Sequence, residues 1–173
     1  ETLEDLMKKN PDKMDEYIEQ MVDIQMQVHS KVVPKLSKLK DKMSRQINSL
    51  DLDDTKKYEL LTRLESMPKH VKLCHGNFVP ENIIYRDGQM YILDWIQARQ
   101  GNASADVGKT YLLLSLRNPE MAEKYLNLFC EKSKTDKRYV QRWLPIVAAA
   151  YLPDAKPEEK EFLEKWADVV EYQ

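Results

Sequence analysis

The stretch that decides the fold is LCHGNFVPENIIY, residues 73–85, followed by MYILDW, residues 90–95. Between them stands RDGQ, residues 86–89, whose Asp-Gly pair is a strong signal for a hairpin turn. The short apolar runs on either side, 82–85 and 90–93, therefore predict a small antiparallel hairpin preceded by a loop.

Polar side chains stand at the start of the loop and at the exit of the hairpin. Asn77 lies in the loop, Asn82 follows five positions later, and Asp94 comes directly after the second apolar run. An amide oxygen and a carboxylate that converge on one cleft are hard ligands of the kind Mg²⁺ prefers. Because Mg²⁺ keeps few protein ligands and shares the rest with substrate, such an ion would hold nucleotide phosphates. The alternative is that the asparagines are turn residues and Asp94 is an ordinary strand-end carboxylate.

The composition favours a helical domain with a buried core. The chain has 173 residues, of which 42% are hydrophobic and 32% charged, and only 4 are glycine. Abundant Met, Lys, Glu and Leu supply good helix formers. We expect helices over residues 1–10, 12–29, 30–45, 51–67, 106–116, 119–132, 137–151 and 157–172.

Charge and apolar content exclude several classes of protein. The formal net charge of −2 argues against a general nucleic-acid binder. No apolar run approaches the roughly 20 residues that a membrane span needs, and no secretory signal is visible. The two cysteines, Cys74 and Cys130, are far apart and lack metal-type spacing. We therefore expect a reduced, cytoplasmic protein without a membrane segment.

The expected helix over residues 30–45 is strongly basic. It carries six Lys and Arg side chains against Asp41 alone, and a basic amphipathic helix can meet a membrane or a nucleic acid. A solvated helix face explains the same pattern and is the simpler interpretation.

The order and spacing of these motifs resemble the aminoglycoside phosphotransferase and choline kinase group. That group has H-G-D-x-x-x-x-N followed by I-D-W or I-D-F, where protein kinases have H-R-D-x-x-x-x-N and D-F-G. This chain has His75-Gly76-Asn77, then Asn82, then Leu93-Asp94-Trp95. The segment GNASADVG, residues 101–108, is similar to the family's G-D-P-x-x-D-L-A. The resemblance covers essentially the whole chain.

The resemblance implies a fold and a set of roles. The fold would be mainly α, with residues 1–173 forming the C-terminal helical lobe of a protein-kinase-like fold, its hairpin carrying the catalytic segment and its N-terminal lobe absent. Asn82 and Asp94 would bind Mg²⁺, and His75 would brace the loop. Position 77 would be the general base, and Asp106 would support the loop from below. The cofactors would be Mg²⁺ with ATP or GTP, and the partner a small molecule with a hydroxyl group.

The chain departs from the family pattern at the base position. Asn77 stands where the family has Asp, and a carboxamide cannot accept a proton at neutral pH. Val79 stands where relatives often have His, and no glycine-rich phosphate loop precedes the motif. We expect impaired chemistry and a truncated large lobe whose uncovered cleft could favour self-association. The alternative is a non-catalytic, pseudokinase-like module that binds a nucleotide or a partner, although the retained Asn82 and Asp94 favour the phosphotransferase.

The last part of the chain is acidic. From Asp154 onward, seven acidic residues stand against three lysines. An acidic wall would suit a cationic acceptor such as an aminoglycoside or choline. A solvated acidic helix is the alternative.

Overall fold

The computed structural model describes residues 1–168 of the chain and is mainly helical. Its α-helices are α1 (Leu3–Lys9), α2 (Met14–His29), α3 (Leu39–Asn48), α4 (Asp54–Ser66), α5 (Ala103–Ser115), α6 (Pro119–Ser133), α7 (Lys137–Tyr151) and α8 (Lys160–Asp168). Its strands are β1 (Lys72–Cys74), β2 (Ile83–Arg86), β3 (Gln89–Ile92) and β4 (Arg99–Gly101). The mainly α fold class with one small hairpin is confirmed.

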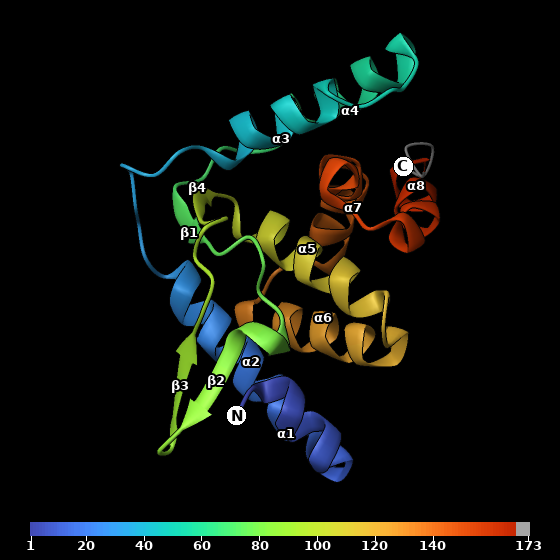
Figure 1. Cartoon of the computed structure of the whole chain (residues 1–173). Coiled ribbons are helices and arrows are strands. Elements are labelled where there is room, and N and C mark those ends of the chain that lie inside the picture. Colours follow the sequence, from blue (N-terminus) through green and yellow to red (C-terminus); the bar gives the residue numbers. More distant parts are fainter. Residues whose placement is uncertain (169–173) are drawn as a thin grey trace.

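The predicted hairpin is formed by β2 and β3. Ile83 pairs with Ile92 and Arg86 with Gln89, in antiparallel register. The turn residue Asp87 has φ 52° and Gly88 has φ 76°. Positive φ at both central positions matches the right-handed twist of the flanking strands, which is why the Asp-Gly pair selects this turn. Figure 1 shows the hairpin projecting from one side of the helical body, beside α1 and α2.

The helix predicted over residues 30–45 is wrong in its first half. Residues 31–38 form a loop with a turn over 34–36 and isolated bridges at Val32 and Lys38, and α3 starts only at Leu39. Pro34 explains the difference, because proline lacks the N–H that a helix interior needs and forces the residue before it out of the helical region. Val32 instead bridges to Lys72.

A second strand pair, between β1 and β4, was not predicted. Lys72 pairs with Gly101 and Cys74 with Arg99, again antiparallel. This pair ties the segment before the loop to the segment that leads into α5. The loop and hairpin are thus closed at their base by a short ladder.

The core lies around α5, which packs against both α6 and α7 (Figure 1). Side chains on nearly every face of α5 are buried, among them Val107, Leu112 and Leu114. A helix that is apolar all round belongs in a core. Trp143 of α7 and Tyr125 of α6 are the largest fully buried side chains around it. This central helix also carries Asp106, so the core positions the site.

Helices α3 and α4 lie along the top of Figure 1, where α3 packs against α7 and β4. At the other end of the chain, α8 packs on α7. Within the predicted helix 157–172, residues Pro157–Glu159 form a 3-10 turn and residues 160–168 form α8. Residues 169–172 of that prediction, including the acidic Glu171, lie outside the described residues. Within residues 1–168, each helix is too short or too polar to cross a membrane.

Candidate functional site

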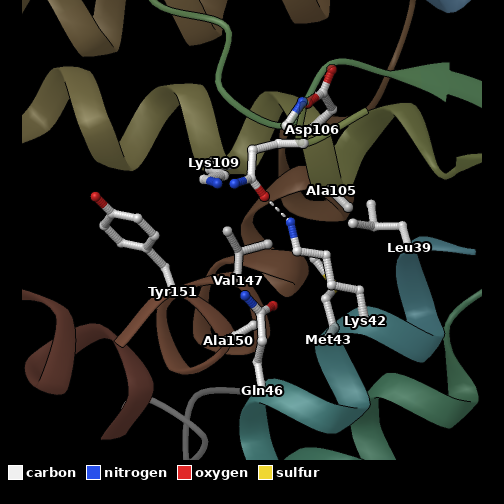
Figure 2. Close-up of a pocket in the computed structure, with 12 residues that line it drawn as sticks. Leu39, Lys42, Met43, Gln46, Ala105, Asp106, Lys109, Val147, Ala150 and Tyr151 are labelled. Carbon is white, nitrogen blue, oxygen red and sulfur yellow. Dashed lines mark hydrogen bonds between the residues drawn. The ribbon is translucent and has the colours of Figure 1, made fainter. Parts of the chain in front are cut away.

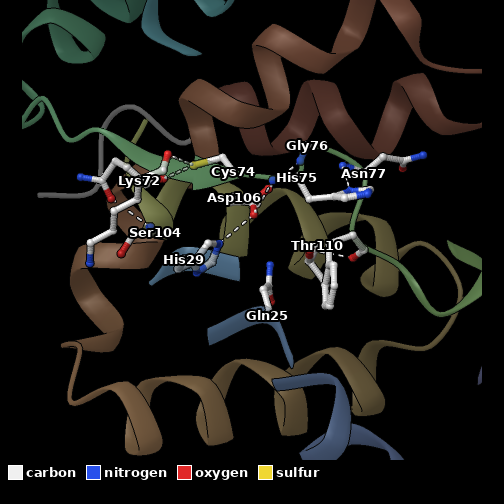
Figure 3. A network of polar contacts seen from close by, with 12 residues as sticks. Gln25, His29, Lys72, Cys74, His75, Gly76, Asn77, Ser104, Asp106 and Thr110 are labelled. Atoms are coloured by element: carbon white, nitrogen blue, oxygen red, sulfur yellow. Dashed lines mark hydrogen bonds and ion pairs between the residues drawn. The ribbon is translucent and has the colours of Figure 1, made fainter. Parts of the chain in front are cut away.

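The loop after β1 is fixed to the core by one carboxylate. Asp106 of α5 accepts a hydrogen bond from the backbone N–H of His75 at 3.1 Å and from that of Gly76 at 2.9 Å (Figure 3). Asp106 is only 2% exposed. A buried carboxylate is tolerated only when its oxygens are satisfied, so this contact fixes the backbone at the start of the loop.

His29, the last residue of α2, supplies a third donor. Its Nε2 lies 2.8 Å from Oδ2 of Asp106, and the histidine is itself buried. A carboxylate can only accept, so Nε2 carries the proton. Burial raises the pKa of Asp106, but the hydrogen bonds from His29, Gly76 and His75 outweigh burial, and the pKa lies below its ordinary value. This contact could not be predicted from local patterns, because His29 and Asp106 are 77 residues apart.

His75 links the loop to the exit of the hairpin. The backbone N–H of Asn77 donates to its Nδ1 at 3.1 Å. Nδ1 is therefore the acceptor, and Nε2 donates to the carbonyl oxygen of Leu93 at 2.8 Å. The ring is fully buried and meets Trp95 edge-on, with ring centroids 4.7 Å apart. Both nitrogens are thus engaged in holding backbone.

Gly76 allows the loop to pass close to the segment after Asp94. Its φ is +87°, and a Cβ at this position would lie 2.8 Å from Cβ and from the carbonyl oxygen of Gln97. Only glycine fits both the dihedral and the space.

The structure brings Asn77, Asn82 and Asp94 together. The side-chain amide of Asn77 donates to Oδ2 of Asp94 at 3.3 Å, and the amide of Asn82 donates to the backbone oxygen of Asn77 at 2.9 Å. The N–H of Leu93 donates to the backbone oxygen of Asn82 at 2.7 Å. Asp94 adopts a left-handed backbone, φ 59°, as Asp and Asn do more readily than most residues.

The donor set of these residues fits Mg²⁺. The nitrogen of the Asn82 amide is used in a hydrogen bond, which leaves its oxygen available, and Asp94 is an exposed carboxylate. Residues 1–168 contain no cluster of three or more His, Cys, Asp and Glu that could hold a metal alone. An ion at this place would take few protein ligands and fill its coordination shell with phosphates and water, which is the habit of Mg²⁺.

Asn77 also faces a cavity of about 300 Å³. Tyr151 of α7 and the charged residues Glu81, Lys156 and Glu159 line it as well. The cavity provides space for a small molecule beside Asn77.

Two site features on α5 escaped sequence reasoning. Thr110 donates to the carbonyl oxygen of Phe78 at 2.8 Å, and Lys109 lies beside the loop. Their spacing from Asp106, about one helical turn, is a signal that could have found them.

The chain is similar to known phosphotransferases. The model of the phosphotransferase enzyme family, APH, matches residues 12–162. A thermostable mutant of aminoglycoside phosphotransferase APH(4)-Ia in its apo form aligns with a TM-score of 0.68 at 15% identity, covering 98% of this chain and 68% of that one. The N202A form of that thermostable mutant, in a ternary complex with AMP-PNP and hygromycin B, aligns with a TM-score of 0.68 at 16% identity and covers 98% and 67%. A search of curated proteins found no match.

Proposed function

The chain belongs to the phosphotransferase enzyme family, and we propose that it acts as the large lobe of a kinase that transfers the γ-phosphate of ATP or GTP to a hydroxyl group of a small molecule. The observation that carries the proposal is that Asn77 contacts both other residues: its backbone oxygen accepts from the amide of Asn82, and its own amide donates to Asp94. The similar structure bound to AMP-PNP and hygromycin B supports a nucleotide and a small-molecule acceptor.

In this proposal Asn82 and Asp94 hold Mg²⁺, which would neutralise charge on the transferred phosphoryl group. The chain's own residues do the positioning. Asp106 and His75 fix the loop backbone, and Asn77 orients the acceptor hydroxyl through its amide. Because Asn77 cannot take the hydroxyl proton, we infer a rate below that of an enzyme with Asp at this position, by roughly 10²–10⁴-fold.

Titration calorimetry with AMP-PNP and Mg²⁺ tests the nucleotide site. We expect binding by the chain that is lost in Asn82→Ala and in Asp94→Asn. The matched control is Asp87→Asn, because Asp87 is also an exposed aspartate with positive φ but lies at the hairpin tip. Equal binding by all variants, or none by the unaltered chain, would remove Asn82 and Asp94 from the role proposed.

A second candidate is a non-catalytic, pseudokinase-like module, and Asn77 is the observation that favours it. Asn77→Asp separates the two. If the chain is an impaired kinase, restoring the carboxylate should raise Mg²⁺-dependent nucleotide hydrolysis by roughly 10²–10⁴-fold, the contribution that general-base catalysis typically makes. A variant that binds nucleotide yet hydrolyses it no faster would favour the binding module.

A further inference from the structure

Two lysines lie beside the loop, in a second and smaller cavity. Lys42 of α3 and Lys109 of α5 both line this cavity of about 30 Å³, together with Gly76 of the loop and Tyr151 of α7 (Figure 2). Figure 2 shows the two side chains entering from opposite helices. The cavity therefore lies between α3 and α5, and Gly76 of the candidate site's loop is part of its lining.

Neither lysine has an anionic partner among the described residues. Lys42 donates to the neutral side-chain oxygen of Gln97, and Lys109 lies over the ring of Tyr151, 5.1 Å from its centroid. Both lysines are only half-exposed. Partly buried cations cost free energy unless they are paired with a negative charge. An anion bound between these two ammonium groups would therefore stabilise them.

The surrounding charges do not supply that negative charge. Burial, and then the neighbouring Lys42, lower the pKa of Lys109 to about 8, although Asp106, Asp154 and Asp94 act in the opposite direction. Burial also lowers the pKa of Lys42. Asp106 lines the same cavity, but its oxygens already accept from His29, His75 and Gly76. The cavity is thus a place where an added anion would be stabilised.

The small cavity adjoins the larger one at Asn77, because Tyr151 lines both. Its volume of about 30 Å³ is small beside the about 300 Å³ of the cavity at Asn77. It therefore has room for one small group and not for a whole substrate. A carboxylate fits this description, and the rest of the molecule would occupy the larger cavity.

We propose that the acceptor is a hydroxylated carboxylic acid, whose carboxylate binds between Lys42 and Lys109 while its hydroxyl lies at Asn77. This inference rests on the proposed function. The acceptor oxygen would form a new bond to the γ-phosphorus of ATP as the bond from that phosphorus to the β-phosphate oxygen breaks. The products are ADP and a phosphorylated acid, and the hydroxyl proton leaves to solvent because Asn77 cannot hold it.

A cationic acceptor, the expectation from the acidic end of the chain, finds less support in these cavities. Glu81 is paired with Arg117 at 2.6 Å. Glu159 accepts from the backbone N–H of Lys156 at 2.9 Å and from the hydroxyl of Tyr151 at 3.5 Å. The carboxylates of Glu81 and Glu159 are therefore engaged, whereas Lys42 and Lys109 meet only the neutral groups of Gln97 and Tyr151.

Lysine side-chain NMR of the chain tests the proposal directly. The probes are glycolate, glycerate and gluconate, each compared with an uncharged polyol of similar size and with choline. We expect the acids to shift the ε-resonances of Lys42 and Lys109 and to raise the titration midpoint of Lys109. Lys42→Met and Lys109→Met keep the apolar stem and should each weaken acid binding roughly tenfold or more. Lys38→Met, at the exposed start of α3, is the control and should bind as the unaltered chain does.

The proposal would be overturned if polyols or choline shifted the lysine resonances as much as the acids do, or if no acid shifted them. The titration midpoint of Lys109, measured in the unaltered chain with and without acid, tests acid binding even if a variant fails to fold. Nucleotide binding is measured separately. Acid binding without nucleotide binding would refute the kinase and keep the carboxylate site, whereas nucleotide binding without acid binding would refute only the acceptor class.

Discussion

Replacing Asp106 by alanine should destabilise the whole fold, because this carboxylate of α5 joins α2 and the loop after β1 to the core. The change removes the acceptor of three hydrogen bonds, from His29 at 2.8 Å, Gly76 at 2.9 Å and His75 at 3.1 Å. Each buried donor left without a partner costs about 1–3 kcal/mol. Because the loop can relax, we expect a total loss of about 3–5 kcal/mol, the range found when a buried polar pair loses one partner. This is a large part of a typical domain stability.

Urea unfolding followed by circular dichroism measures this loss, provided the slope of the transition is unchanged. Asp94→Asn is the matched control, since Asp94 is a second aspartate of the same site but is exposed. Its stability should change by no more than about 0.5 kcal/mol. If Asp106→Ala cost less than about 1 kcal/mol, or no more than the control, the claim that Asp106 holds the loop to the core would be refuted.

Three further predictions follow from the same contacts. Gly76→Ala should cost about 1–3 kcal/mol of unfolding free energy, more than Gly88→Ala, because both have positive φ but only Gly76 meets Gln97; equal losses in urea would argue against the close contact. Folding lowers the pKa of Asp106, so the ionised carboxylate stabilises the folded chain above about pH 4, and this stabilisation is lost as the pH falls through the folded pKa. The difference in unfolding free energy between the unaltered chain and Asp106→Asn, measured in urea, should therefore narrow below about pH 4. A difference that stays constant with pH would contradict this. Asn77→Asp should make thermal stability depend on Mg²⁺, since two carboxylates would then face each other where Asn77 and Asp94 lie 3.3 Å apart; a melting temperature that ignores Mg²⁺ would count against a shared site.

The local parts of the fold could be predicted from the sequence. The hairpin follows from an Asp-Gly pair between apolar runs, and the bounds predicted for α7 match Lys137–Tyr151. Pro34 is a local signal against the helix predicted over 30–45, because proline interrupts a helix interior, and α3 starts only at Leu39. The errors of local prediction therefore have local causes.

The contacts between distant segments could not be predicted in this way. β4 pairs with β1 across the loop and the hairpin, and neither strand alternates clearly enough to be recognised alone. His29 and Lys42 come from α2 and α3 and reach the site only through tertiary packing. Periodicity states which face of a helix is buried, but it does not state which polar group that face meets.

The site has a buried frame, formed by Asp106, His29 and His75, and a more exposed pair, Asn77 and Asp94. In the frame, Asp106 accepts from the side chain of His29 and from the loop backbone at His75 and Gly76. Asn77 and Asp94 are more exposed and meet through one long hydrogen bond. An aspartate at position 77 would place like charges at that contact, and a cation would be needed to offset the repulsion. Asparagine turns the repulsion into a hydrogen bond, and its carboxamide cannot accept a proton at neutral pH. Because His75 holds position 77 through its backbone N–H, a substitution at position 77 should change the proton chemistry of the contact with Asp94 and leave the backbone geometry of the loop in place.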